Sequence, residues 1–300
     1  MSSLKDNITT LKKDRNALIL AHNYCLPEVQ DIADHTGDSL GLSIIASKAD
    51  ADVIIFCGVT FMAESAKVLN PRKKVLMPEP FATCPMASMC SAEQIIDARK
   101  CHKDACVVGY VNTTASAKAE MDICCTSSNA VNIVSSMKEK EIIFVPDMNL
   151  GSYVASKAPS KNIILWNGYC PVHQSITVQN ISDLKAKYPN AVVVAHPECR
   201  SDVLNAADLI GSTEKMIEYA KASDAKEFIV ATEIGMKHRL SKECPGKRFH
   251  FIDHALCSVM KMTTLSSVLR TLNEMTTEVT LPEDTMERAK GPLKRMIDVK

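Results

Sequence analysis

The sequence has little glycine, little proline and no surplus of either charge. Its 300 residues include 10 Gly and 13 Pro, and 35 basic residues balance 35 acidic ones. With 46% hydrophobic residues, this is ordinary globular composition, and the length allows two or three domains. Because no basic surplus exists to neutralise a phosphate backbone, the composition argues against nucleic acid as a partner.

Long apolar runs are also missing. Residues 1–7 are mostly polar and lack the apolar stretch of a secretory signal peptide. No uncharged apolar run approaches the length that spans a bilayer. We therefore expect a soluble, cytoplasmic protein with no membrane partner.

Cysteine, in contrast, is abundant, with twelve residues. A cytoplasmic chain is not expected to depend on disulfides. None of the cysteines forms a C-x-x-C pair, which argues against a zinc ribbon or a thioredoxin-type site. Most should be small, buried apolar residues, so only an ordered subset would indicate a site.

An internal repeat selects such a subset. Strand-like runs rich in Val and Ile recur at 17–24, 105–112 and 191–198, then at 52–56, 141–145 and 227–231, and then at 74–77, 162–165 and 248–252. One cysteine follows each run of the last set, and these three, Cys84, Cys170 and Cys257, are 86 and 87 residues apart.

The repeat predicts the fold. Short, continuous Val/Ile runs are typical of parallel strands buried on both faces, and segments of helical periodicity lie between them. Strand–helix alternation implies right-handed βαβ crossovers. We predict an α/β protein of three pseudo-threefold-related, three-layer αβα domains with the active site at their central interface. The expected domains are 1–100, 101–187 and 188–273, with an amphipathic helix in 274–300 packing back on the first.

The three repeat-phased cysteines indicate a metal site. A single cysteine is more often a core residue, but three at equivalent strand ends can converge on one ion. Zinc fits three thiolates with His173 as fourth ligand. A [4Fe–4S] cluster usually takes four cysteines; with three, one iron stays open as a Lewis acid, which favours dehydration chemistry over electron transfer.

Polar pairs end the first strand of each repeat: His22 and Tyr24, Tyr110 and Asn112, and His196 and Glu198. Alternate residues of an extended chain point the same way, so each pair can reach one ligand. Tyr24 and Glu198 are the candidates for proton transfer.

Small hydroxyl residues stand just before predicted helices: Ser39, Ser127, Ser212 and Thr213. Such residues commonly cap helices. A capped helix N-terminus also binds carboxylate or phosphate, so both roles are compatible and all four are candidate binding residues.

At these residues the sequence resembles the quinolinate synthase family, over nearly the whole chain. The matching stretches are 21–24 (AHNY), 27–34 (PEVQDIAD), 37–40 (GDSL), 61–64 (FMAE), 126–130 (TSSNA), 170–173 (CPVH) and 196–199 (HPEC). Together they are specific, although any one of them would be a weak signal.

The resemblance implies a [4Fe–4S] cluster held by Cys84, Cys170 and Cys257. It implies substrate contacts at His22, Ser39, Tyr110, Asn112, Ser127, His196, Glu198 and Thr213. It also implies acid–base roles for Tyr24 and Glu198, with His173 near the substrates. Some family members carry C-x-x-C-x-x-C around the third ligand; Cys257 stands alone here, so a regulatory disulfide is not expected.

The implied reaction condenses iminoaspartate with dihydroxyacetone phosphate to quinolinate, phosphate and two waters, for NAD biosynthesis. An aspartate-oxidising enzyme is the implied transient partner, because iminoaspartate is unstable in water.

The residues alone are also compatible with three other functions. An iron–sulfur electron carrier or redox sensor would need a fourth cysteine, for which Cys199 is the candidate. A zinc enzyme would use the three cysteines with His173. A non-catalytic anion-binding protein would not need the aligned thiols.

Overall fold

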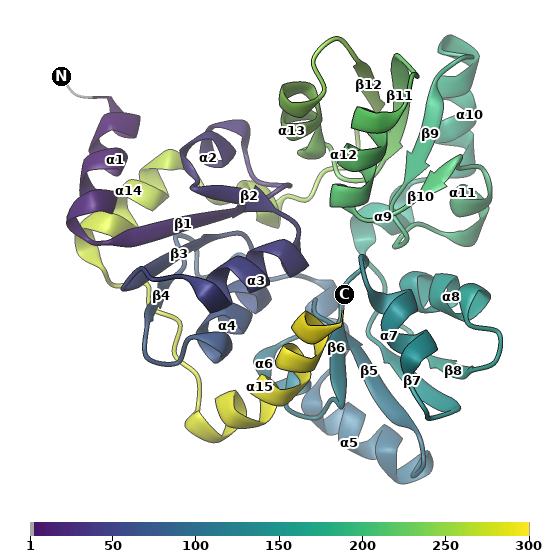
Figure 1. The fold of residues 1–300 in the computed structure, drawn as a ribbon, viewed down its shortest axis with the longest axis horizontal. Coiled ribbons are helices and arrows are strands. Elements are labelled where there is room, and N and C mark those ends of the chain that lie inside the picture. Colours follow the sequence, from purple (N-terminus) through teal and green to yellow (C-terminus); the bar gives the residue numbers. More distant parts are fainter. Residues whose placement is uncertain (1–2, 300) are drawn as a thin grey trace.

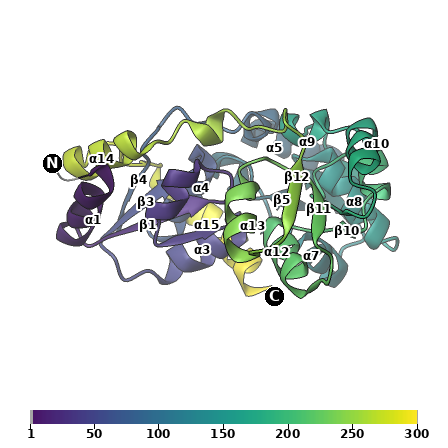
Figure 2. The same ribbon diagram turned by 90° about the horizontal axis from the view of Figure 1, so that it is seen from above.

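The computed structural model describes residues 3–299 and shows three similar α/β units around a common centre (Figure 1). Each unit has one four-stranded parallel sheet flanked by helices. Seen from above, the three units lie in one flat layer (Figure 2). The predicted α/β fold of three αβα units is confirmed.

The first unit has the strand order β2-β1-β3-β4. Its elements are α1 (Leu4–Asp14), β1 (Ala17–His22), α2 (Pro27–Ile32), β2 (His35–Gly37), α3 (Ser39–Lys48), β3 (Val53–Cys57), α4 (Thr60–Leu69), β4 (Lys74–Leu76) and the 3₁₀ turn η1 (Met86–Met89). Every residue of β3 is buried, which explains its uninterrupted apolar sequence.

The second unit repeats this order as β6-β5-β7-β8. Its elements are α5 (Ala92–Cys101), β5 (Cys106–Tyr110), α6 (Ala115–Lys118), β6 (Ile123–Cys125), α7 (Ala130–Ser136), β7 (Glu141–Val145), α8 (Met148–Lys157), β8 (Asn162–Leu165) and α9 (Pro171–Ser175). Helix α5 starts in a capping box, in which Ser91 and Gln94 satisfy each other's backbone N–H groups.

The third unit has the order β10-β9-β11-β12. Its elements are α10 (Val178–Lys187), β9 (Val192–Ala195), α11 (Ser201–Asn205), β10 (Leu209–Ile210), α12 (Thr213–Ala222), β11 (Glu227–Ala231), α13 (Met236–Glu243), β12 (Arg248–Phe251) and the 3₁₀ turn η2 (Val259–Lys261). Two further helices follow, α14 (Leu265–Glu274) and α15 (Glu283–Asp298).

The edge strands β2, β6 and β10 are not among the predicted strands. They have three, three and two residues, too few for a periodic pattern to show. An aspartate directly precedes each of these strands and links it to the neighbouring strand by a hydrogen bond. The carboxylates of Asp34, Asp122 and Asp208 accept the backbone N–H groups of Ile19, Val107 and Val193, at 2.8, 2.7 and 2.8 Å.

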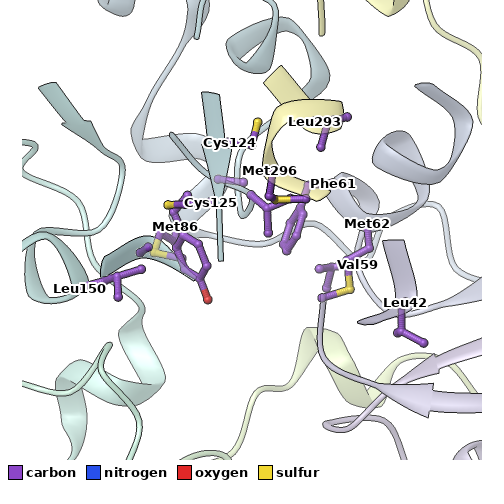
Figure 3. Close-up of a cluster of buried hydrophobic side chains, with 14 of the residues drawn as sticks. Leu42, Val59, Phe61, Met62, Met86, Cys124, Cys125, Leu150, Leu293 and Met296 are labelled. Carbon is purple, nitrogen blue, oxygen red and sulfur yellow. The ribbon is translucent and has the colours of Figure 1, made fainter. Parts of the chain in front are cut away.

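The C-terminal helices return to the start of the chain. Helix α14 packs against α1, and α15 packs against α4 of the first unit and against α6 and β6 of the second. Figure 3 shows Met296 of α15 between Cys124 of β6 and Phe61 of α4, with Leu293 on the same helix. The predicted helix at the C-terminus thus contacts two units, and the predicted domain limits stay predictions.

Within residues 3–299, no helix combines the length and the apolar character needed to cross a bilayer.

Candidate active site

A central cavity lies where the carboxyl ends of the strands of all three units meet. Thirteen of the candidate residues line it: His22, Tyr24, Ser39, Cys84, Tyr110, Asn112, Ser127, Cys170, His173, His196, Glu198, Thr213 and Cys257. This is the edge of a parallel sheet at which ligands bind in open α/β folds. Among the described residues that line the cavity, none is Lys or Arg.

Ser212 is the candidate that does not line this cavity. Its hydroxyl accepts the backbone N–H of Lys215 at 3.4 Å and so caps α12. It lines a neighbouring groove that also includes Ser127. Thr213, one residue further along, is the hydroxyl of this helix that reaches the cavity.

The polar pairs reach the cavity from turns. Beyond β1 the backbone N–H of Cys25 donates to the carbonyl of His22 at 2.9 Å, and beyond β9 that of Cys199 donates to His196 at 2.9 Å. The pairs therefore converge because the chain turns sharply after each strand. Extended alternation, the geometric reason behind the prediction, does not apply there.

Glu198 lies at the centre of a buried imidazole network. Its Oε2 is 3.1 Å from Nδ1 of His173 and 3.0 Å from Nδ1 of His196. Burial opposes ionisation, but the two imidazoles together hold the pKa of Glu198 below its usual range. An ionised carboxylate only accepts hydrogen bonds. Nδ1 of His196 also accepts the backbone N–H of Glu198 at 3.4 Å, and Nε2 of His196 lies 3.1 Å from the Ser127 hydroxyl.

Two buried polar atoms in the cavity wall lack a hydrogen-bond partner within the described chain. They are Oε1 of Glu198 and Oδ1 of Asn112. Buried acceptors are nearly always paired in folded proteins. Their placement in one cavity indicates that it binds a polar ligand.

Burial also controls the other titratable groups of the cavity. It lowers the pKa of His22 to about 3 and that of His173 to about 4, so both rings are neutral at pH 7. Burial, with Glu198 adding to it, raises the pKa of Tyr24 well above its ordinary value. The site therefore presents the neutral imidazoles of His22 and His173, the Glu198 carboxylate and the protonated phenol of Tyr24.

Each of the three repeat-phased cysteines precedes a short helical turn whose N–H groups point at its sulfur. Sγ of Cys84 receives N–H groups of Met86 and Ala87. Sγ of Cys170 receives that of His173, and Sγ of Cys257 those of Val259 and Met260. Burial raises the pKa of all three thiols, and these N–H groups oppose that rise.

The same three sulfurs suit a metal cofactor. All twelve cysteines of the chain are free thiols, and Cys84, Cys170 and Cys257 line both the central cavity and an outer pocket. They come from three different units, so they can surround one metal group. Cys170 also lies with His173 and Glu198 in a group whose ligand atoms are within 4.8 Å of one another.

Cys199, the candidate fourth ligand of an electron carrier, lies elsewhere. It is fully buried, and its Sγ donates to the carbonyl of Ala231 at 3.4 Å. It lines neither the cavity nor the outer pocket. The described chain therefore brings three cysteines to the site.

Carboxylates that sequence reasoning missed support two of the cysteine loops. Oδ2 of Asp147 accepts the N–H of Cys170 at 3.3 Å, and Oε1 of Glu233 accepts that of Cys257 at 3.0 Å. Glu233 also pairs with Lys261 at 2.8 Å. Asp147 and Glu233 are 86 residues apart, the spacing of the repeat, which is the signal that could have found them.

Thr232 was missed as well. Its hydroxyl is 2.7 Å from the Tyr24 hydroxyl and 2.9 Å from Nε2 of His173. No motif marked it, because its partners belong to the other two units.

Comparison with known proteins gives a consistent family. A family model described as "Quinolinate synthetase A protein" matches residues 6–298. Quinolinate synthase of Aquifex aeolicus is 47% identical over 305 residues, covering 100% of this chain and 95% of the relative. Quinolinate synthase 1 of Methanosarcina acetivorans is 51% identical over 300 residues, covering 100% and 98%. Quinolinate synthase of Dehalococcoides mccartyi (strain CBDB1) is 50% identical over 297 residues, covering 99% and 98%. The chain belongs to the quinolinate synthetase A family.

Proposed function

We propose that this protein is a quinolinate synthase that condenses iminoaspartate with dihydroxyacetone phosphate, giving quinolinate, phosphate and two waters for NAD biosynthesis. The observation that carries the proposal is the meeting of three thiols, three imidazoles and the Glu198 carboxylate from three units in a single buried cavity. Family membership supports the same assignment.

Both substrates are anionic, and we propose that neutral donors bind them. Ser39 and Thr213 are the first residues of α3 and α12, each ten residues long. The N–H groups and the dipole at such helix ends favour carboxylate and phosphate. Ser127, Tyr110 and Asn112 add hydroxyl and amide groups. Selectivity would then come from the placement of hydrogen-bond donors, since no lysine or arginine lines the described cavity.

Tyr24, Glu198 and His173 are the proposed acid–base residues. Oε1 of Glu198 is free to accept a proton or a hydrogen bond from a ligand. The protonated hydroxyl of Tyr24 can donate or hold a proton on the other side of the cavity. His173 and His196 keep Glu198 ionised and oriented, and the burial of the cavity limits the access of bulk water to reactive intermediates.

Cys84, Cys170 and Cys257 would hold a [4Fe–4S] cluster. When bound by three cysteines, such a cluster supplies an open iron that acts as a Lewis acid in dehydration. The donor set fits, because three unpaired thiols, each facing backbone N–H groups, line the cavity. Zinc at Cys170, His173 and Glu198 is the alternative that the side-chain grouping favours.

The cytoplasm is the proposed location, because twelve free thiols suit a reducing compartment. We also propose a transient association with the aspartate-oxidising enzyme that supplies iminoaspartate, which would shorten the exposure of that unstable compound to water.

The test is anaerobic purification, iron and sulfide analysis, and a quinolinate assay with freshly generated iminoaspartate and dihydroxyacetone phosphate. We expect four irons per chain and quinolinate formation, both lost in Cys84→Ala, Cys170→Ala or Cys257→Ala. The control variants are Cys101→Ala, at an exposed thiol, and Cys199→Ala, at the buried one; both should keep the cluster. A colourless zinc protein that forms no quinolinate would refute the proposal.

A further inference from the structure

Lys118 is a completely buried lysine behind the wall of the central cavity. It ends α6 of the second unit, and its Nζ donates to the backbone carbonyl of Thr113. Nζ also lies 5.4 Å from the centre of the Phe61 ring, in α4 of the first unit. Phe61 lines the cavity and Lys118 does not. One aromatic ring therefore stands between this lysine and the cavity.

The same part of the wall carries the loop of Cys84. The backbone N–H of Thr60, which precedes Phe61, donates to the carbonyl of Ala82 at 2.9 Å. Ala82 is two residues before Cys84, and Cys84 lines the cavity together with Phe61. The loop of Cys84 is thus attached to the start of the helix that Lys118 contacts.

Lys118 is buried without an acidic partner. Two other lysines with little exposure do have one, since Lys67 pairs with Glu278 at 3.1 Å and Lys261 pairs with Glu233 at 2.8 Å. Lys118 forms no ion pair within residues 3–299, and its hydrogen bond goes to an uncharged carbonyl. Lysine is almost never fully buried unless it is paired, because an uncompensated buried charge is costly. A negative charge is therefore expected near Lys118 when the site is loaded.

The surroundings of Lys118 indicate which group carries that charge. Burial lowers the pKa of Lys118 to about 8, so it remains largely protonated at pH 7, and negative charge on Cys124, Glu64 or Cys84 opposes this shift. Cys124 stays an uncharged thiol, because burial raises its pKa to about 12. The Glu64 carboxylate accepts the backbone N–H of Ala115 at 2.7 Å. A thiol that coordinates a metal gives up its proton, so Cys84 becomes negative when metal binds.

We propose that Lys118 supplies the positive charge that compensates the metal–thiolate group at Cys84. Three thiolates carry more negative charge than a [4Fe–4S] core or a zinc ion carries positive charge, so the loaded site is anionic. A nearby cation stabilises such a group and favours the addition of an electron to a cluster. Lys118 therefore strengthens metal retention and raises the reduction potential. The inference rests on the proposed function for the identity of the metal group.

The first test separates the charge of Lys118 from its hydrogen bond. Lys118→Gln keeps a donor for the Thr113 carbonyl and removes the charge, whereas Lys118→Arg keeps both. In the anaerobically purified full chain, Lys118→Gln should shift the ratio of oxidised to reduced cluster at a fixed potential about tenfold towards the oxidised form. This corresponds to about 59 mV for one electron, measured by a redox titration with electron paramagnetic resonance. Lys118→Arg should stay close to the wild type.

Metal retention is a second readout and does not depend on activity. Transfer of the metal to a chelator should be about tenfold faster from Lys118→Gln than from the wild type. Lys67→Gln is the matched control, because Lys67 is also buried but is paired with Glu278 and does not line the cavity. This variant should keep the potential and the metal retention of the wild type. If Lys118→Gln does not fold, Lys118→Met, with an apolar side chain, replaces it in both measurements.

Two results would overturn the inference. A Lys118→Gln protein that matches Lys67→Gln in both readouts would leave Glu64 as the only counter-charge of Lys118. Equal changes in Lys118→Gln and Lys118→Arg would show that the shape of the side chain matters and its charge does not. Retention is measured for whichever metal the wild type holds, so a zinc-containing wild type that forms no quinolinate refutes the proposed function alone.

Discussion

The first unit meets its two neighbours in different ways. Buried apolar side chains of α4 and α15, Phe61, Leu293 and Met296, form much of its contact with the second. Hydrogen bonds such as those of Glu64 to Ala115 and of Asp38 to Ser128 add to that contact. The first unit meets the third across polar side chains. Asn23 donates to Thr213 at 2.8 Å and to Glu214 at 3.2 Å, and Arg239 donates to Asn23 at 2.7 Å.

The polar contact extends along the outside of the first and third units. Asp31 pairs with His238 at 2.9 Å and with Lys242 at 3.1 Å. Lys261 bonds to the backbone carbonyl of Tyr24. When two surfaces separate, buried apolar side chains lose the stabilisation that burial gives them. Polar groups, in contrast, can replace their protein partners with water. We therefore expect the contact between the first and third units to open at a lower free-energy cost than the contact between the first and second.

The largest effect is expected from breaking the apolar contact. Leu293→Ala should lower the free energy of unfolding by about 3 kcal/mol, because Leu293 is completely buried and the truncation leaves a cavity. Urea denaturation measures this. Leu4→Ala, at a leucine that is 45% exposed, is the control and should change little; equal losses in the two variants would contradict the assignment.

Breaking the polar contact should cost less. Arg239 binds Glu214, Glu243 and Asn23, so Arg239→Gln should lose about 1–2 kcal/mol. Amide exchange near Asn23 should become faster, while exchange in α15 stays unchanged. Arg200→Gln is the control, since Arg200 pairs with Asp202 of its own unit at the surface. Faster exchange in α15 would show that the two contacts are not independent.

The contact between the first and third units should also make the stability of the protein sensitive to acid. Burial lowers the pKa of His22 to about 3, with Lys261 and Arg239 disfavouring its charge further. Because the unfolded pKa is near 6.5, the unfolded chain binds the proton first. Stability should therefore fall as pH drops from about 6.5 towards 3, by at most about 1.4 kcal/mol per pH unit from this group.

His22→Gln tests this by removing the titrating ring. The dependence of the melting temperature on pH should become shallower below pH 6.5, and the variant should differ least from the wild type at low pH. An identical slope in both proteins would rule out His22 as the source.

The smallest effect is expected at the surface ion pairs. Asp31→Asn should lose under about 1 kcal/mol, because exposed pairs are weak. It should also reduce the loss of stability between 0.1 and 1 M NaCl, since salt screens these charges. Thermal melts at the two salt concentrations measure both. Salt sensitivity equal to that of the wild type would show that Asp31 contributes nothing to the contact.

Sequence reasoning was most successful where the chain repeats. Nine of the twelve strands lie in the predicted runs, most of them rich in Val and Ile, and the shared spacing of these runs brought the cysteines and the polar pairs into one predicted site. Strands β2, β6 and β10 were not predicted because they have only two or three residues and contain no Val/Ile-rich run. The aspartates at 34, 122 and 208 share the spacing of the repeat and could have revealed these strands.

Contacts between units could not be predicted in the same way. The partners of Thr232 are 208 and 59 residues away, and no local pattern encodes such distances. The packing of α14 on α1 has the same origin. Ser212 was predicted to bind a ligand from its position in the sequence, but its hydroxyl caps its own helix. Only the backbone path decides that Thr213, and not Ser212, reaches the cavity.

The three units share the residues that support the sheet but differ in the residues at their equivalent strand ends. The aspartates at 34, 122 and 208 are identical in all three units and do the same structural job three times. At the strand ends, the corresponding positions carry tyrosine, asparagine and glutamate, namely Tyr24, Asn112 and Glu198. Three units of the same fold thus present three different functional groups to one asymmetric ligand. The loss of any one of these side chains therefore cannot be compensated by the other two units.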